Sequence, residues 1–174
     1  MTDIIFPIFQ RDLSALFGDP DETAEYLTTM DFTEFAEAFA GVLDYQGNPW
    51  GLKIYGHELL EAPLRRAFQY LVERGLAGEL QTYDGCFNIR QMKGGSGYSV
   101  HSWGLAVDLN AVYNRFGQEP TFSSDFVRCF ADCGFEWGGL WTPDRYRDGM
   151  HFQLPLIRVR TGPLAPIPWK PQET

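Results

Sequence analysis

Hydrophobic side chains recur at helical spacing between Glu58 and Arg74, which is the clearest pattern in the chain. The apolar positions are Leu60, Leu64, Ala67, Phe68, Leu71 and Val72. This period predicts an amphipathic helix with one buried face. Pro63 is tolerated only in a first helical turn, so we expect the helix to begin near Leu60. Gly75 stands where a C-terminal capping glycine would.

Shorter patterns predict the other elements. Apolar runs at residues 105–109 and 150–154 predict two strands, the second of which is stopped by Pro155. Residues 82–90 are a further candidate strand, interrupted by Asp84-Gly85. Residues 124–133 predict a second helix that Gly134 ends, and residues 92–97 form a glycine-rich loop.

Residues 31–57 allow two interpretations. Phe32, Phe35 and Phe39 have the spacing of a helix. However, Gln46-Gly-Asn-Pro49 predicts a turn, and the segment that starts at Trp50 alternates like a strand. We favour a β-hairpin that closes at this turn. Because helices and short strands interleave, with hairpin-like connections, the pattern favours an α+β fold with a small antiparallel sheet and flanking helices.

Composition narrows the range of functions. The chain has 174 residues, enough for one domain with a sizeable core, and a net charge of −9. So acidic a chain is a poor general binder of nucleic acid, whose phosphates are contacted by Lys and Arg. No apolar run is long enough to span a membrane, and the first residues lack the positive charge and the apolar run of a signal peptide. We therefore expect synthesis in the cytoplasm, with release by another factor if the protein acts outside.

The three cysteines, Cys86, Cys129 and Cys133, form no CxxC pair and are odd in number. A thiolate zinc knuckle and a disulfide scaffold are therefore both unexpected, and buried free thiols are the simplest interpretation.

Two short segments carry the candidate chemistry. Ser99-Val-His-Ser-Trp-Gly-Leu-Ala-Val-Asp108 supplies His101 and Asp108, and Asp148-Gly-Met-His151 adds a second histidine with a carboxylate three residues before it. A catalytic zinc site needs three nitrogen or oxygen ligands, an open position for water and a nearby base. The two segments together supply that set.

Structural roles for the same residues remain open at this stage. Asp108 lies between Val107 and Leu109, where an unpaired carboxylate would cost several kcal/mol. A metal ion would remove that cost, but so would backbone N–H groups of a neighbouring loop. An isolated histidine such as His151 is commonly just partly buried, and His57, before the long helix, is expected to be structural.

The site segments resemble a known family. Arg90-Gln-Met-Lys-Gly-Gly-Ser-Gly-Tyr-Ser-Val-His-Ser-Trp-Gly-Leu-Ala-Val-Asp-Leu-Asn110, then Gly134-Phe-Glu-Trp-Gly-Gly-Leu-Trp141 and Asp148-Gly-Met-His-Phe152, closely resemble the M15 metallopeptidases. These include D-Ala-D-Ala carboxypeptidases and dipeptidases, and the L-alanyl-D-glutamate endopeptidases of phage lysis systems. The resemblance implies a small α+β fold shared with the hedgehog signalling domain. It also implies a zinc peptidase domain at residues 50–155, between an N-terminal arm or accessory segment (1–49) and a proline-rich tail (156–174).

By this resemblance, His101, Asp108 and His151 are zinc ligands. Asp148 is the general base and acid, at a position where family members often have Glu. Arg90 matches the arginine that steadies the scissile carbonyl or a substrate carboxylate. Beside these, we expect Ser99, Tyr98, Trp103 and Trp141 to bind substrate, and Ser99, Ser102 and Asn110 are candidates for orienting the ligand histidines.

The leading hypothesis is a zinc peptidase that hydrolyses the stem peptide of peptidoglycan. The short chain without signal or anchor favours the lytic L-alanyl-D-glutamate endopeptidase type. The alternatives are a D-Ala-D-Ala carboxypeptidase or dipeptidase, a non-catalytic metal-stabilised binding module on a hedgehog-like fold, and a wall enzyme delivered to a competitor. The expected partner is the stem peptide, without nucleic acid or membrane, and the default state is a monomer.

Overall fold

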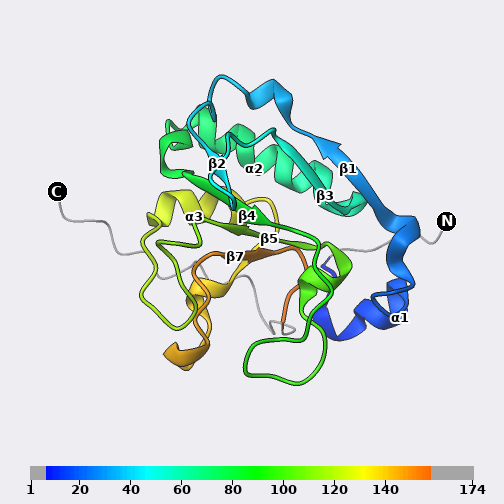
Figure 1. Ribbon diagram of the computed structural model, residues 1–174. Coiled ribbons are helices and arrows are strands. Elements are labelled where there is room, and N and C mark those ends of the chain that lie inside the picture. The colour runs from blue at the N-terminus through cyan, green and yellow to red at the C-terminus, as the bar shows by residue number, and fades with distance from the viewer. Residues whose placement is uncertain (1–6, 158–174) are drawn as a thin grey trace.

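Two sheets and three helices organise the chain in a computed structural model that describes residues 7–157 (Figure 1). The helices are α1 (Leu13–Phe17), α2 (Glu61–Glu73) and α3 (Ser124–Ala131). The strands are β1 (Leu27–Asp31), β2 (Leu43–Asp44), β3 (Lys53–His57), β4 (Thr82–Gly85), β5 (Ala106–Leu109), β6 (Glu136–Trp137) and β7 (His151–Gln153). Most of the proline-rich segment predicted at 156–174 lies outside the described residues.

The larger sheet has five strands in the order β2-β4-β5-β7-β6. Its pairs are antiparallel except β2 with β4, which is parallel, and β1 and β3 form a separate antiparallel pair. The predicted α+β class is confirmed.

The long helix has the predicted form. Pro63 lies in its first turn, Leu64, Ala67, Phe68 and Leu71 are buried, and Gly75 after its end has a left-handed φ of 71°. Val72, which we grouped with the buried face, is instead 42% exposed. The predicted second helix is confirmed as α3, which ends two residues earlier than expected.

The hairpin predicted within residues 31–57 is confirmed only beside its turn, where Leu43 and Pro49 form an isolated antiparallel bridge. The turn exists, because the Asp44 carboxylate accepts hydrogen bonds from the Gln46 and Asn48 N–H groups. The flanking strands, however, join different sheets, since β2 pairs with β4 and β3 pairs with β1. Leu52 takes a left-handed φ of 55° between them. Neighbouring rings pack on Phe68 of α2, so burial against the helix outweighs local strand pairing.

The core crosses the boundary predicted after residue 49. Met30, Phe32 and Phe39 are almost fully buried in the same cluster as Phe68 and Leu109. The division into residues 1–49 and 50–155 therefore stays a prediction without a matching break in packing.

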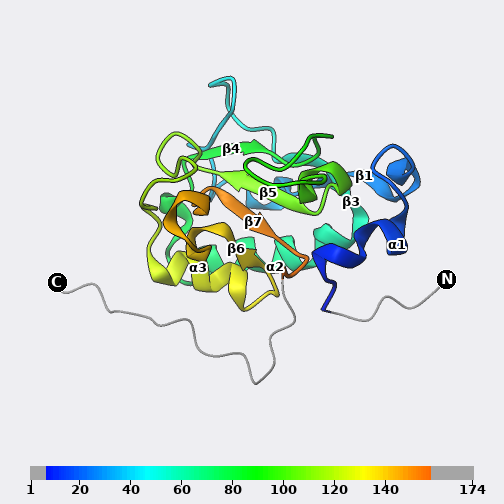
Figure 2. The same ribbon diagram turned by 90° about the horizontal axis from the view of Figure 1, so that it is seen from below.

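Helices α2 and α3 lie together under one face of the five-stranded sheet (Figure 2). Strand β7 shows how this arrangement places the site. Phe152 points to the helices, where its ring is 4.5 Å from that of Phe130. Because side chains alternate along a strand, His151 and Gln153 point to the opposite face.

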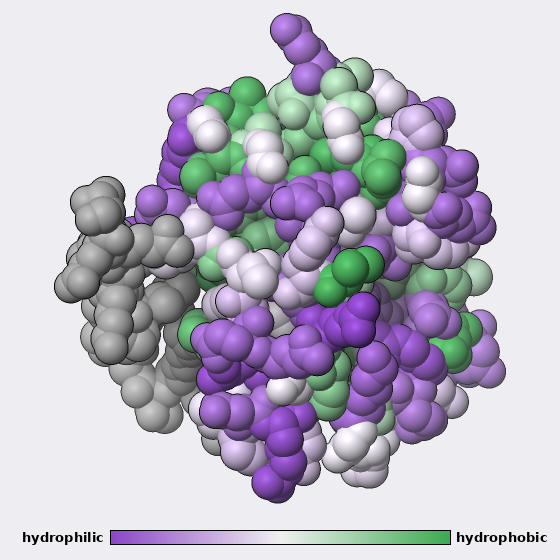
Figure 3. Space-filling model, turned by 60° about the vertical axis from the view of Figure 1, so that its left-hand side comes forward, coloured by the Kyte–Doolittle hydropathy of each residue, from purple (hydrophilic) through white to green (hydrophobic). Residues whose placement is uncertain are grey.

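The face shown in Figure 3 is mainly hydrophilic, with hydrophobic residues gathered toward the top of the view. Exposed apolar residues are normal on a folded protein. Among residues 7–157, no helix has the length and apolar character needed to cross a membrane.

Candidate metal centre

Two local features bring His101 and Asp108 together. His101 lies in a short 3-10 turn, Val100–Trp103, which ends at Gly104 with a left-handed φ of 67°. A Cβ at Gly104 would lie 2.7 Å from the His57 nitrogen, so only glycine fits this reversal. The chain then enters β5, where Asp108 stands directly opposite His151 of β7.

Three ligand-type atoms converge in the ligand cluster, which we define as His101, Asp108 and His151. Nε2 of His101 lies 3.1 Å from Asp108 Oδ1 and 3.0 Å from His151 Nδ1. The separation between His151 Nδ1 and Asp108 Oδ1 is 3.3 Å. Ligands of a tetrahedral zinc ion at about 2.0–2.1 Å stand roughly 3.3 Å apart, so the observed spacing fits such an ion.

The outer nitrogens of both rings face oxygen acceptors. His101 Nδ1 is 2.6 Å from the Cys86 carbonyl, and His151 Nε2 is 2.9 Å from Oε1 of Gln153. In neutral imidazoles each of these nitrogens carries the proton, which leaves His101 Nε2 and His151 Nδ1 as lone-pair donors. Two lone pairs and a carboxylate oxygen then point at one another, an arrangement that a cation stabilises.

The residues of the ligand cluster shift one another's pKa values. Burial opposes ionisation of Asp108, but His101 and His151 outweigh it and hold the pKa of this carboxyl well below its usual range. Burial alone would lower the pKa of His151, yet its hydrogen bond to Asp108 raises it. The cluster is therefore arranged around an ionised carboxylate.

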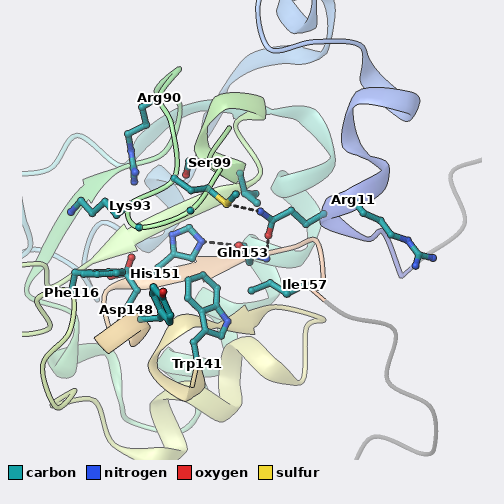
Figure 4. Close-up of a pocket in the computed structure, with 16 residues that line it drawn as sticks. Arg11, Arg90, Lys93, Ser99, Phe116, Trp141, Asp148, His151, Gln153 and Ile157 are labelled. Atoms are coloured by element: carbon teal, nitrogen blue, oxygen red, sulfur yellow. Dashed lines mark hydrogen bonds between the residues drawn. The ribbon is translucent and has the colours of Figure 1, made fainter. Parts of the chain in front are cut away.

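A cleft of about 490 Å³ opens above His151. Figure 4 shows His151 in its middle, Phe116 and Lys93 to one side, and Ile157 to the other. Further lining comes from the glycine-rich loop at residues 92–97 and from Tyr146. The ligand cluster thus borders, through His151, a groove large enough for a small peptide segment.

Asp148 also lines this cleft, on the turn before β7. Its Oδ1 is buried and has no hydrogen-bond partner among residues 7–157. Burial raises the pKa of this carboxyl, although nearby His151 acts in the opposite direction. A carboxylate with a raised pKa beside a metal site has the property needed of a general base.

Arg90 lines the same cleft and extends from its upper rim in Figure 4. Its backbone is fixed by Ser102, whose Oγ accepts from the Arg90 N–H and donates to the Arg90 carbonyl. Ser102 therefore holds the arginine in place and makes no contact with a ligand ring.

The four predicted substrate-binding residues divide into two pairs. Ser99 and Trp141 line the cleft, and the Trp141 ring lies 5.3 Å from that of His151. Trp103 is buried with its Nε1 donating to the Gly18 carbonyl, and Tyr98 packs edge-on against it. Neither Tyr98 nor Trp103 belongs to the cleft lining, so a substrate contact is not supported for them.

The groups that orient the ligand histidines differ from the expected ones. Neither Ser99, Ser102 nor Asn110 contacts a ligand ring, and Asn110 instead binds the backbone of the neighbouring segment at Gln81. The Cys86 carbonyl and the Gln153 side-chain oxygen lie opposite the outer ring nitrogens instead. A signal for Gln153 existed, because it stands two residues after His151 and so shares its face of the strand. No feature of the sequence singled out Lys93 and Phe116, which also line the cleft.

The remaining candidates are structural. His57 is fully buried, accepts a hydrogen bond from the Leu59 N–H and stacks on Tyr26. All three cysteines are free, and Cys86 donates to the Gly104 carbonyl.

The His-Asp-His cluster could hold a metal ion, and its His151 lines a cleft on an α+β fold. In a comparison with known families, residues 93–154 match the M15 peptidase family model described as D-alanyl-D-alanine carboxypeptidase. This match confirms the M15 resemblance and spans the ligand cluster and Asp148, while Arg90 lies just before it. It implies a peptidase with a peptidoglycan-related substrate. Comparisons with curated proteins and with solved structures gave no significant match.

Proposed function

We propose that this protein is a zinc peptidase that hydrolyses a peptide bond in the peptidoglycan stem peptide. The observation that carries the proposal is the convergence of His101 Nε2, Asp108 Oδ1 and His151 Nδ1 beside the cleft that His151 lines. The donor set, two neutral imidazoles and one carboxylate, is typical of catalytic zinc.

The surrounding residues have distinct roles in this proposal. Zinc bound at the cluster would lower the pKa of a coordinated water to about 7 and polarise a carbonyl. Asp148 accepts the proton of the attacking water and returns it to the leaving amine, a transfer for which its raised pKa is suited. Arg90 stabilises negative charge that develops on the carbonyl oxygen.

Within this activity we propose the L-alanyl-D-glutamate endopeptidase type. An endopeptidase must bind chain on both sides of the reacting bond, and the cleft extends to both sides of His151 (Figure 4). Arg90 and Lys93 on its rim suit the carboxylates of a stem peptide, although the whole chain is acidic. Because peptidoglycan lies outside the cytoplasmic membrane, we further propose that the protein acts there after release.

Mass spectrometry of peptidoglycan fragments tests the proposal. Purified sacculi are digested with zinc-loaded protein, and with protein that carries His101→Ala as the control. We expect new termini at the bond between L-alanine and D-glutamate, only with the unaltered protein. Loss of terminal D-alanine alone would support a D-Ala-D-Ala carboxypeptidase, the alternative favoured by the description of the matching family model. Intact stem peptides would contradict both and favour a metal-stabilised binding module.

A further inference from the structure

The His151 ring works as a ligand only in one tautomer. Its Nδ1 faces His101 and Asp108, at 3.0 and 3.3 Å, so a proton on Nδ1 would occupy the place of a cation. The proton must therefore be on Nε2, and the group opposite Nε2 decides this. That group is Gln153, at 2.9 Å from the ring.

An amide can present either its oxygen or its nitrogen, and only the oxygen accepts the Nε2 proton. The orientation of the Gln153 amide is fixed by the hydrogen bonds of its nitrogen. Its Nε2 donates to the Pro155 carbonyl at 2.6 Å and to Gln10 Oε1 at 3.4 Å. Both partners are acceptors, so a reversed amide would face them with its oxygen. Gln153 is only 1% exposed, so a reversed amide would leave buried polar groups without hydrogen bonds.

Gln10 comes from the N-terminal part of the chain, far from the site segments in sequence. Its N–H donates to the Leu156 carbonyl at 2.8 Å, which fixes it beside the end of β7. Its side-chain amide bridges Gln153 to Met92 of the glycine-rich loop, where Nε2 lies 3.2 Å from the thioether sulfur (Figure 4).

We propose that Gln153 is a positioning residue that holds the His151 ring with its Nδ1 lone pair toward the ligand cluster, and that Gln10 holds Gln153 in the orientation this requires. The inference rests on the metal site of the proposed function, but not on its substrate. It assigns the segment before α1 a part in metal binding.

Zinc affinity, measured by competition with a chromogenic chelator, tests this proposal. Gln153→Met keeps the length of the side chain and removes both of its hydrogen-bonding ends. Loss of such an outer partner typically weakens metal binding about 10–100-fold. Gln10→Met should weaken it less, because the Pro155 carbonyl still orients Gln153. As a second readout, the His151 Nε2–H proton of the zinc-loaded protein should exchange faster with solvent in both variants.

Leu154→Val is the matched control. Leu154 follows Gln153 in the chain and is 4% exposed. Its apolar side chain cannot form a hydrogen bond to a ligand ring. The substitution should lower the melting temperature and leave zinc affinity unchanged. Zinc affinity equal to wild type in both glutamine variants would overturn the positioning role, whatever the protein does to peptidoglycan. A wild-type chain that binds no zinc would overturn the metal site and this inference with it. Metal binding without wall hydrolysis would refute only the proposed activity.

Discussion

A substitution at Asp148 tests proton transfer separately from metal binding. Asp148 lines the cleft with a buried oxygen that has no hydrogen-bond partner in the described part of the chain, and it is not one of the three converging ligands. Asp148→Asn keeps the size of the side chain and removes its basicity. We expect peptide hydrolysis to fall about 10²–10⁴-fold with zinc affinity unchanged, because general acid–base catalysis contributes about that factor. Turnover of a purified muropeptide and chelator competition measure the two quantities.

Asp144→Asn is the control for this variant. Asp144 lies on the same loop, highly exposed, and pairs with Arg147 at 2.8 Å. Exposed pairs of this kind contribute little, so its turnover should equal wild type. Full activity of Asp148→Asn would assign the proton transfer to another group.

At the level of residues, the sequence predicted which side chains meet but not what holds them. His101, Asp108 and His151 are recognisable from residue type and spacing, and they do converge. Their outer partners are less accessible to prediction. The Cys86 carbonyl carries no side-chain signal at all, and Gln10 reaches the site only through tertiary packing. Trp103 is buried outside the cleft lining, because an aromatic ring near a cleft motif serves equally well in a core.

The turn between His101 and β5 depends on one glycine. Gly104 combines a φ of 67° with a backbone contact that leaves no room for a Cβ. Gly104→Ala should therefore destabilise the fold by more than the cost of about 1 kcal/mol that a left-handed alanine alone carries. It should also weaken zinc binding, because His101 lies in the 3-10 turn that ends at Gly104. Urea unfolding and chelator competition measure these effects.

Gly75→Ala is the control, because it introduces the same backbone strain without steric crowding of the added Cβ. Gly75 has nearly the same φ, 71°, but no atom lies within 4 Å of the position of an added Cβ. Its alanine variant should show only the conformational cost and bind zinc normally. Equal losses in the two variants would mean that the close approach at Gly104 is unimportant.

His57, at the junction of β3 and the following turn, should make stability depend on pH. Burial lowers its pKa from 6.5 to about 4. Between these values the unfolded chain binds more protons than the folded one, so stability rises with pH in this window and its full contribution is present above 6.5. The predicted loss on acidification approaches about 3 kcal/mol. His57→Asn keeps an acceptor for the Leu59 N–H but cannot titrate, so this part of the slope should disappear.

Urea unfolding of zinc-free protein between pH 4.5 and 8 provides the measurement. Phe17→Leu is the control, since the Phe17 ring packs 4.5 Å from that of His57 without titrating. It should lower stability at every pH and leave the slope intact. A slope that persists unchanged in His57→Asn would show that other groups account for it.

Long periodic elements were predictable, whereas strand partners were not. Helix α2 follows from its own spacing, because one amphipathic face determines its burial. The partners of β2 and β3 are set by distant contacts, including the rings around Phe68, and the local turn at Asp44 is compatible with either pairing. The predicted strand at residues 82–90 was too long for a similar reason, since pairing with β5 ends at Gly85.

For the molecule as a whole, the ligand cluster links segments that lie far apart in the chain. His101 and Asp108 belong to one segment and His151 to another, while Gln10 approaches from the N-terminal side. The three ligands come together only in the folded state, so the free energy of zinc binding adds to the free energy of unfolding. Zinc should therefore stabilise the entire core and not merely the site.

Thermal unfolding with and without zinc tests this coupling. At free zinc about 100 times its dissociation constant, the expected gain is about 2.7 kcal/mol. For a chain of this size that corresponds to a rise in Tm of roughly 5–10 °C. The rise should be absent in His101→Ala, which lacks one ligand, and should be retained in Asp148→Asn, which lacks none. If His101→Ala shows the same rise, zinc binds elsewhere and the cluster of His101, Asp108 and His151 is not its site.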